Sequence, residues 1–229
     1  MVGLGRLADE VFEAVIFDMD GTLIDSTPAV LRAWTTWMHE YGLSPEEMGR
    51  HHGMPSAQVV RSLLAEDQQV AAIRRIDELE LADVHDIVVL PGAAEALAVL
   101  RSAKSAIATS CTLPLAKARI AAAQLVPPSV LVTVDDVRHG KPAPDPFLEA
   151  ARQLGVDPRR CLVVEDAPKG LEAAHAAQCA TLAVVTTTAR EDLDADAVVT
   201  NLSEVVFVPG PDGIRVRLAE ARTDESSAA

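Results

Sequence analysis

The chain has 229 residues, of which 49% are hydrophobic, so it can bury a large core in one domain or in a core with a smaller attached domain. The formal net charge of −14 argues against nucleic acid or an anionic membrane surface as the main partner, and no run of 18 apolar residues is available to span a membrane. Three cysteines without metal-type spacing, and an acidic N-terminus without a signal sequence, favour reduced thiols and a cytoplasmic location.

The first predicted element is a strand over residues 14–17, and it ends on two carboxylates, Asp18 and Asp20, which are followed by Gly21 and Thr22. An uninterrupted apolar run of this length is typical of a short buried strand. Two neighbouring negative charges at its end need an offset, and a divalent cation such as Mg²⁺, which prefers oxygen ligands, would provide it. The alternative is a strand that leaves the core into an ordinary acidic turn.

A helical insertion is predicted over residues 27–88, because about 90 residues separate the first strand from the next, far more than an ordinary crossover needs. Its first helix is expected to end at Gly42. The apolar side chains on one face of that helix are Leu31, Trp34, Met38 and Tyr41. Further helices are expected from Ser44 and Pro45 onward and over residues 56–65 and 69–83. We expect both tryptophans of the chain to pack inside this insertion.

Beyond the insertion, short apolar runs alternate with segments of helical periodicity. The predicted strands are residues 106–109, 130–133, 161–165, 181–185 and 197–199, and the predicted helices are 93–103, 115–124, 145–154 and 170–178. This alternation indicates an α/β core with a Rossmann-like, mostly parallel sheet, which binds ligands beyond the carboxyl ends of its strands. A hairpin is expected over 206–208 and 214–218. The core would then comprise residues 1–26 and 89–222, with a disordered tail over 223–229.

Polar groups follow several of these strands. Ser110 ends the second strand and offers a hydroxyl and backbone amides beside a helix start, although an ordinary helix cap has the same sequence. Cys111 follows it and is counted with Ser110 among the expected substrate contacts. Lys141 lies in a loop constrained by proline and glycine that would aim its ammonium group at a phosphate and a nucleophile, the alternative being a solvated lysine.

A second strand end also carries paired acids, Glu165 and Asp166. Together with Asp18 they provide the oxygen ligands of a Mg²⁺ site, with Asp166 expected to bind directly and Glu165 directly or through water. Asp18 suits attack on phosphorus, and Asp20 suits proton transfer to the leaving oxygen and from the attacking water. Thr22 is expected to hold Asp20 by a hydrogen bond, although a purely structural turn role is an equal alternative.

These motifs, taken in order along nearly the whole chain, resemble those of the haloacid dehalogenase superfamily of phosphatases. The first motif is similar to residues 18–22, the second to Ser110, the third to Lys141 and the fourth to residues 165–166. The helical insertion resembles the first class of cap domains in that family. The resemblance implies that Asp18 is the nucleophile, that Asp20 is the acid and base, and that Mg²⁺ is held by Asp18, the Asp20 backbone carbonyl and Asp166. It also implies a monomer.

Within the family, the sequence favours phosphate ester hydrolysis. Dehalogenases lack the second aspartate of the first motif, which here is Asp20, and phosphonatases need a cap lysine, whereas residues 27–88 contain none. The nearest rival is a sugar phosphomutase resembling β-phosphoglucomutase. Such mutases carry a histidine about ten residues past the first motif, where this chain has Val30. A non-catalytic binding protein with this fold is a further alternative, but it would be expected to have lost some of the motif residues.

The predicted cap contains Arg50, His52 and Gly53 in one short segment. A His-Gly pair there resembles family members that hydrolyse sugar and glycerol phosphates, such as 2-deoxyglucose-6-phosphatase. His52 would donate hydrogen bonds to a polyol and Arg50 would favour anionic groups, the alternative being a capping or surface histidine. The sequence therefore predicts a cytoplasmic, Mg²⁺-dependent phosphatase of a small phosphorylated sugar or polyol.

Overall fold

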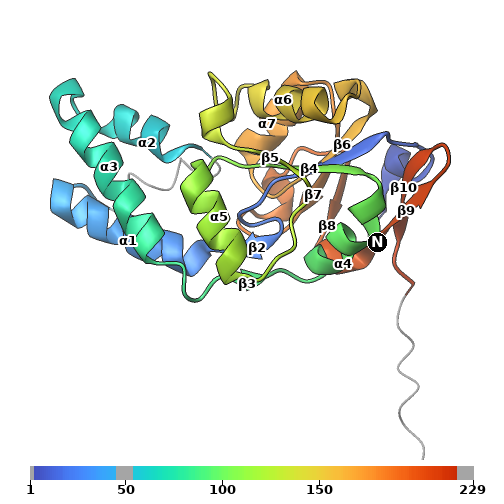
Figure 1. Ribbon diagram of the computed structural model, residues 1–229, viewed down its shortest axis with the longest axis horizontal. Helices are drawn as coiled ribbons and strands as arrows, with labels where there is room; N and C mark the ends of the chain where they lie inside the picture. Colours follow the sequence, from blue (N-terminus) through green and yellow to red (C-terminus); the bar gives the residue numbers. More distant parts are fainter. Residues whose placement is uncertain (1–2, 45–53, 221–229) are drawn as a thin grey trace, which may run out of the picture.

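The computed structural model describes residues 3–44 and 54–220, and its centre is a six-stranded sheet in the order β5-β4-β1-β6-β7-β8 (Figure 1). Every neighbouring pair in this sheet is parallel, as predicted. The strands are β1 (Ala14–Phe17), β4 (Lys104–Ala108), β5 (Val130–Val132), β6 (Cys161–Glu165), β7 (Ala180–Val184) and β8 (Ala197–Val199). Each lies within two residues of its predicted bounds.

Helices cover both faces of the sheet. They are α4 (Ala93–Val99), α5 (Leu113–Ala122), α6 (Asp145–Leu154) and α7 (Pro168–Ala176). Successive residues of a strand face opposite sides, and in β1 Val15 packs into the cluster that contains side chains of α4 and α5, whereas Ile16 packs into the cluster of α6 and α7. Burial on both faces explains why β1 is an unbroken apolar run.

A hairpin of β9 (Val205–Gly210) and β10 (Gly213–Leu218) closes one side of the core, and its antiparallel pairing was predicted. The ring of Phe207 packs edge-on against that of Phe17, with their centroids 5.7 Å apart. The hairpin thereby covers the end of β1, the strand that leads to the first motif.

The helical insertion has a hydrophobic cluster of its own. Its helices are α1 (Thr27–Tyr41), α2 (Ser56–Leu63) and α3 (Glu66–Ala82). Trp34, Trp37 and Met38 of α1 pack with apolar residues of α2 and α3, which confirms the predicted burial of both tryptophans. Gly42 ends α1 at a φ of 68°, as expected for a left-handed cap. The prediction that Leu31 belongs to the apolar face of this helix is wrong, because Leu31 is 54% exposed and does not belong to this cluster.

The two connections between the insertion and the core run side by side. They form a short antiparallel ribbon of β2 (Ile24–Asp25) and β3 (Val88–Val89). None of the described helices is long and apolar enough to cross a bilayer. The predicted helix start at Ser44 and Pro45 lies partly outside the described residues.

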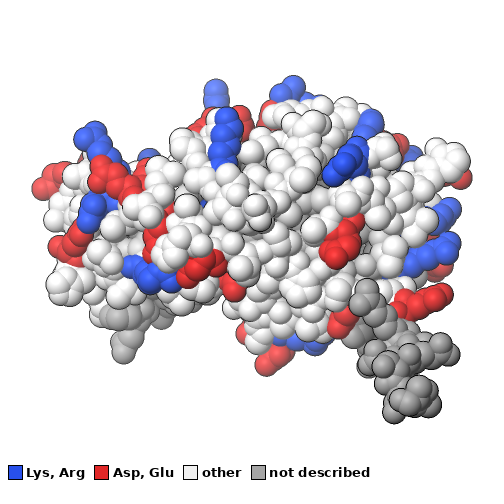
Figure 2. All heavy atoms as spheres, turned by 60° about the horizontal axis from the view of Figure 1, so that its bottom comes forward, with Lys and Arg blue, Asp and Glu red and all other residues white. Residues whose placement is uncertain are grey.

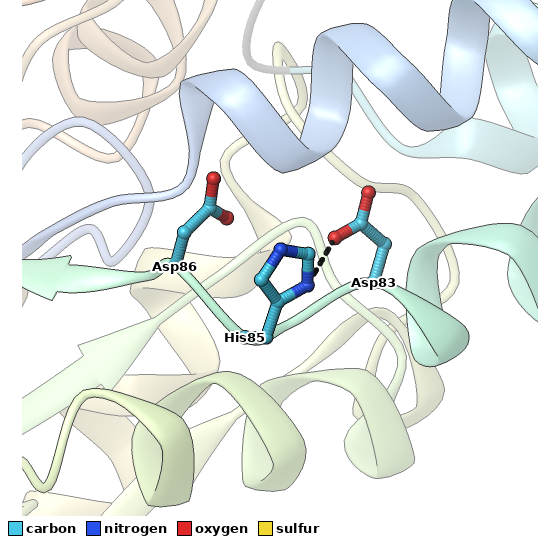
Figure 3. A group of neighbouring side chains, drawn as sticks. All are labelled: Asp83, His85 and Asp86. Atoms are coloured by element: carbon cyan, nitrogen blue, oxygen red, sulfur yellow. Dashed lines mark ion pairs between the residues drawn. The ribbon is translucent and has the colours of Figure 1, made fainter.

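An arginine of α1 holds the segment that leads back to the core. Asp83, His85 and Asp86 gather on this segment, with His85 Nδ1 3.0 Å from an oxygen of Asp83 (Figure 3). Each of the two carboxylates accepts two hydrogen bonds from Arg32, at donor–acceptor distances of 2.7–2.9 Å. We therefore interpret the group as a clamp between α1 and the segment after α3, and its exposure to solvent keeps its contribution to stability small.

Trp37 offers a test of how the insertion is held together. Its side chain is fully buried and its indole N–H donates to the Ala72 carbonyl at 2.9 Å. Trp37→Ala is expected to lower the free energy of unfolding by about 3–5 kcal/mol, and Trp37→Phe by less, because the ring is mostly retained. Denaturant unfolding followed by circular dichroism measures both. Val70→Ala, at a side chain that is 72% exposed, is the control and should shift stability by no more than about 0.5 kcal/mol. Equal midpoints for Trp37→Ala and Val70→Ala would contradict this packing.

Candidate active site

The predicted site residues meet at the carboxyl edge of the three central strands. Asp18 follows β1, Ser110 follows β4, and Glu165 ends β6 with Asp166 directly after it. The sheet order places β1 between β4 and β6, so the groups that follow these strands converge. This is the edge at which parallel sheets commonly bind ligands.

Lys141 lies at the centre of this group. Its ammonium nitrogen is 2.5 Å from Asp18 Oδ1 and 2.7 Å from Glu165 Oε1, and its side chain is only 1% exposed. The alternative of a solvated loop lysine is therefore wrong. Burial by itself would lower the pKa of Lys141, but the charges of Asp18 and Glu165 outweigh burial and raise the pKa above its usual value. The ammonium thus stays charged beside the candidate nucleophile.

Glu165 uses both of its carboxylate oxygens within the protein. Oε1 accepts from Lys141, and Oε2 accepts from the backbone N–H groups of Asp166 and Ala167, each at 2.7 Å. Gly170 makes room for this carboxylate, since a Cβ at that position would lie 1.6 Å from Oε1. Glu165 therefore anchors Lys141 and shapes the turn that presents Asp166.

Asp166 is held by two hydroxyl groups. Thr187, in the loop after β7, donates to its Oδ2, and Thr22 lies 3.4 Å from its Oδ1. The expectation that Thr22 holds Asp20 is thus wrong, because the turn after β1 aims this hydroxyl across to the loop after β6. Gly21 has a φ of +88°, and a Cβ there would lie 2.2 Å from Asp166 Oδ2, so the turn needs glycine. Thr187 was not predicted, although a run of threonines after a predicted strand was a usable signal.

The electrostatics of this group favour a cation. Oxygens of Asp18, Glu165 and Asp166 lie within 4.8 Å of one another, and all three residues are buried. Burial, with Glu165 as a contributing charge, raises the pKa of Asp18 to about 7 and that of Asp166 well above its usual value. A single ammonium group faces three carboxylates here, so full ionisation of all three would leave two negative charges uncompensated. This donor set fits a hard divalent cation.

Asp20 has a different environment from Asp18. Its Oδ1 accepts from Ser26 at 2.6 Å and from Arg119 at 2.9 Å, and the Cys111 thiol donates to its Oδ2 at 3.1 Å. Burial and the Asp20 charge raise the pKa of Cys111 well above its usual value, so the thiol keeps the proton that it donates. The Asp20 side chain is 24% exposed, compared with 9% for Asp18. Asp20 is thus firmly held yet open to the adjacent cavity.

Arg119 of α5 and Glu80 of α3 belong to the site but were missed from the sequence. Arg119 Nη2 is 3.1 Å from Glu80 Oε1, and both side chains are 4% exposed. Ser56 of α2 donates to the other Glu80 oxygen at 3.0 Å. The available signal was a charge on an apolar helix face, since Arg119 follows Leu115 and Ala116 by one helical turn.

A cavity of about 140 Å³ lies between the strand ends and the helical insertion. Its core side includes Asp18, Asp20 and two of the predicted substrate contacts, Ser110 and Cys111, whereas Thr22 and Lys141 do not line it. The side formed by the insertion is largely apolar. It is lined by Val30, Leu31, Trp34, Met54 and Val59, with Thr27, Ser56 and Glu80 as polar groups. The predicted cap contacts Arg50, His52 and Gly53 lie outside the described residues.

Residues 12–178 match the model of a hydrolase family, the haloacid dehalogenase-like hydrolases. The chain belongs to this family. It is 39% identical over 205 residues to hexitol phosphatase A of Escherichia coli, covering 86% of this chain and 95% of that protein. It is 32% identical over 183 residues to fructose-1-phosphate phosphatase YqaB of Escherichia coli, covering 73% and 94%. The crystal structure of CbbY from Rhodobacter sphaeroides in complex with phosphate matches with a TM-score of 0.75 and 26% identity, covering 84% of this chain and 96% of that one.

These findings confirm three predictions. The family is the one that the motifs resemble, and the parallel-sheet α/β fold is shared with solved members. The prediction of a phosphoric monoester hydrolase is confirmed at the level of the enzyme class, because the curated relatives are named phosphatases.

Gly170→Ala tests the support of Lys141 by Glu165. The added methyl group cannot share the space of Glu165 Oε1, so Glu165 must move and Lys141 loses an anchor. We expect a loss of about 100-fold in kcat/KM on 4-nitrophenyl phosphate, because small displacements of a catalytic group have effects of this size. Gly3→Ala, where a Cβ meets nothing within 4 Å, is the matched control and should keep full activity. Unchanged kcat/KM in Gly170→Ala would show that Glu165 does not position Lys141.

Proposed function

We propose that this protein is a Mg²⁺-dependent phosphatase that hydrolyses a small phosphorylated sugar or polyol through a phosphoryl group carried on Asp18. The observation that carries the proposal is the division of environments between the two aspartates of the first motif. Asp18 is buried against the Lys141 ammonium group, whereas Asp20 is held by three donors at the wall of the cavity. We therefore assign the attack on phosphorus to Asp18 and the proton transfers to Asp20.

In the first step, a carboxylate oxygen of Asp18 forms a bond to phosphorus while the bond from phosphorus to the substrate's ester oxygen breaks. Asp20, protonated at this stage, donates its proton to that oxygen, so the alcohol leaves neutral. The Lys141 ammonium group lies 2.5 Å from Asp18 Oδ1 and stabilises the negative charge gathered on the phosphoryl oxygens. Ser110 lines the same cavity, and its hydroxyl is proposed to donate to one of these oxygens.

In the second step, water attacks the phosphorus of the aspartyl-phosphate. Asp20, now a carboxylate, takes a proton from this water, and the bond between phosphorus and the Asp18 oxygen breaks to release phosphate. Both aspartates return to their starting protonation states. Ser26, Arg119 and Cys111 keep Asp20 in one place through both proton transfers.

Asp18 and Asp166 would hold the Mg²⁺ ion, joined by the backbone carbonyl of Asp20 that the family resemblance implies. Glu165, whose oxygens accept from Lys141 and two backbone amides, would contact the ion through water. When bound, the ion offsets the charge of the carboxylates and of the phosphoryl oxygens.

A phosphorylated substrate is anionic and the chain has a formal net charge of −14, so binding requires positive charge close to the site. On the face shown in Figure 2, Lys and Arg side chains are scattered among Asp and Glu and form no continuous basic patch. We attribute the attraction for phosphate to the proposed cation and to Lys141, which contacts Asp18. Thr27 and Ser56 offer the insertion's hydroxyl groups to the substrate, in keeping with the hexitol and sugar phosphates named for the relatives.

The helical insertion over residues 27–88 is proposed as a cap, with the core over 1–26 and 89–222. Its side of the cavity is formed by α1, α2 and α3, and the β2–β3 ribbon is the connection at which it would hinge. Val30 lines the cavity at the position where the related mutases carry a histidine. An apolar side chain there cannot hold the acid–base residue away from water, which supports hydrolysis over mutase activity.

Asp18→Asn tests the nucleophile. The amide is not expected to attack phosphorus, so phosphate release should fall at least about 1,000-fold across a panel of hexitol, sugar, glycerol and nucleotide monophosphates with Mg²⁺. Among these, hexitol and sugar phosphates should have the highest kcat/KM. Asp9→Asn, at an exposed carboxylate, is the control and should behave as wild type. Substantial phosphate release by Asp18→Asn would rule out the mechanism, and a requirement for a sugar bisphosphate would favour the mutase.

Metal removal tests the cation. Chelation followed by gel filtration should abolish phosphate release, and added Mg²⁺ should restore it. Asp166→Asn replaces one proposed ligand and should raise the Mg²⁺ concentration needed for half-maximal activity by about tenfold or more. Full activity after chelation, or an unchanged Mg²⁺ requirement in Asp166→Asn, would contradict this assignment.

A further inference from the structure

Arg119 links the two parts of the molecule that enclose the cavity. Its guanidinium group donates from Nη1 to Asp20 of the first motif and from Nη2 to Glu80 of the insertion helix α3. Glu80 is in turn held by Ser56 at the first residue of α2. A continuous chain of hydrogen bonds therefore runs from two helices of the insertion, through a core helix, to the carboxylate proposed to transfer protons.

The burial of Arg119 and Glu80 argues that these hydrogen bonds do more than stabilise the fold. Arg119 and Glu80 side chains are each 4% exposed, and burial raises the pKa of Glu80 although Arg119 opposes the effect. A buried ion pair often contributes no more to stability than apolar side chains of the same volume would. The guanidinium is also incompletely paired, because its Nε has no hydrogen-bond partner within the described part of the chain.

We propose that Arg119 is the positioning residue for Asp20, and that Glu80 makes this positioning depend on the insertion. This inference rests on the proposed phosphatase function. Asp20 has no other cationic partner among the described residues. Ser26 and Cys111 donate one hydrogen bond each, whereas Arg119 adds a charge-assisted bond, which is the stronger kind.

The role of Glu80 follows from the geometry of the guanidinium group. A planar fork fixed at Nη2 by Glu80 holds Nη1 in a defined direction toward Asp20. When α3 lies against the core, Asp20 is aligned for proton transfer. Displacement of α3 removes Glu80 and leaves the guanidinium with one carboxylate, free to draw Asp20 from that alignment. Proton transfer would thus be efficient only while the insertion encloses the substrate.

A comparison of substrates with different leaving groups distinguishes a misplaced Asp20 from a generally impaired active site. An alkyl phosphate needs a proton on its leaving oxygen, whereas 4-nitrophenyl phosphate releases a stable anion without one. The parameter kcat/KM covers only the steps up to release of the leaving group, so the later attack of water does not enter. A variant with misplaced Asp20 must therefore lose kcat/KM on the alkyl ester far more than on the aryl ester.

The experiment compares both esters in wild type, Asp20→Asn, Arg119→Met, Glu80→Gln and the double variant Arg119→Met/Glu80→Gln, using the best alkyl phosphate of the panel. Asp20→Asn defines the selective loss. Arg119→Met is expected to lose about 100-fold on the alkyl ester and no more than about threefold on the aryl ester. Glu80→Gln, which keeps the shape but not the charge, should show about a tenfold selective loss. Arg119→Lys should recover part of what Arg119→Met loses.

The double variant removes both buried charges together, so it tests the inference even where Arg119→Met alone is unstable. It should match Arg119→Met on both esters, because Glu80 acts only through Arg119. Arg75→Met, which breaks an ion pair with Glu40 inside the insertion, is the matched control and should leave the ratio of the two esters unchanged.

The inference is overturned if Arg119→Met and the double variant, folded by circular dichroism, lose both esters equally. It is also overturned if Glu80→Gln lowers kcat/KM as much in the Arg119→Met background as in wild type. A wild-type protein that hydrolyses neither ester would instead contradict the proposed function. A selective loss in Asp20→Asn alone would leave the function intact and reject only the link through Arg119.

Discussion

The site depends on one buried ammonium group placed among three carboxylates. Lys141 contacts Asp18 and Glu165 with almost no access to water, and Asp166 lies beside them. Such a cluster is unfavourable unless each charge has a partner in good geometry. The surrounding structure meets this demand with backbone amides for Glu165, hydroxyl groups for Asp166 and two glycines where any Cβ would collide with a carboxylate. The same cluster is left with the negative charge that a divalent cation would balance.

The parallel sheet explains how residues so far apart in sequence form one cluster. β1 has β4 and β6 as neighbours, so the loops after these strands open at one edge. The apolar residues of β1 are buried on both faces, which holds the strand rigidly and places Asp18 at a fixed point. The turn that follows then separates the two aspartates, with Asp18 directed into the charged cluster and Asp20 toward the cavity. Two identical side chains therefore have different surroundings, which is the basis of the different roles proposed for them.

The helical insertion adds what the core lacks, a second wall for the cavity and a second set of polar groups. Its own hydrophobic cluster keeps α1, α2 and α3 together as a unit, and the β2–β3 ribbon joins that unit to the core. Arg119 and Glu80 connect the unit to Asp20 across the cavity. In this arrangement the same helices that would select the substrate also contact, through Arg119, the carboxylate proposed to transfer protons.

The sequence alone determined the family and the parallel sheet. It also predicted the site residues Asp18, Asp20, Ser110 and Asp166, because each follows a short apolar strand, and Lys141 from its loop constrained by proline and glycine. It did not show that Lys141 is buried, that Thr22 lies against Asp166 instead of Asp20, or that Leu31 is exposed. Arg119, Glu80 and Thr187 were assigned to the site only in the folded chain, although a charge on an apolar helix face and a run of threonines had marked Arg119 and Thr187. Their partners lie tens of residues away, and burial of a charge is decided by packing between distant segments, which no local pattern encodes.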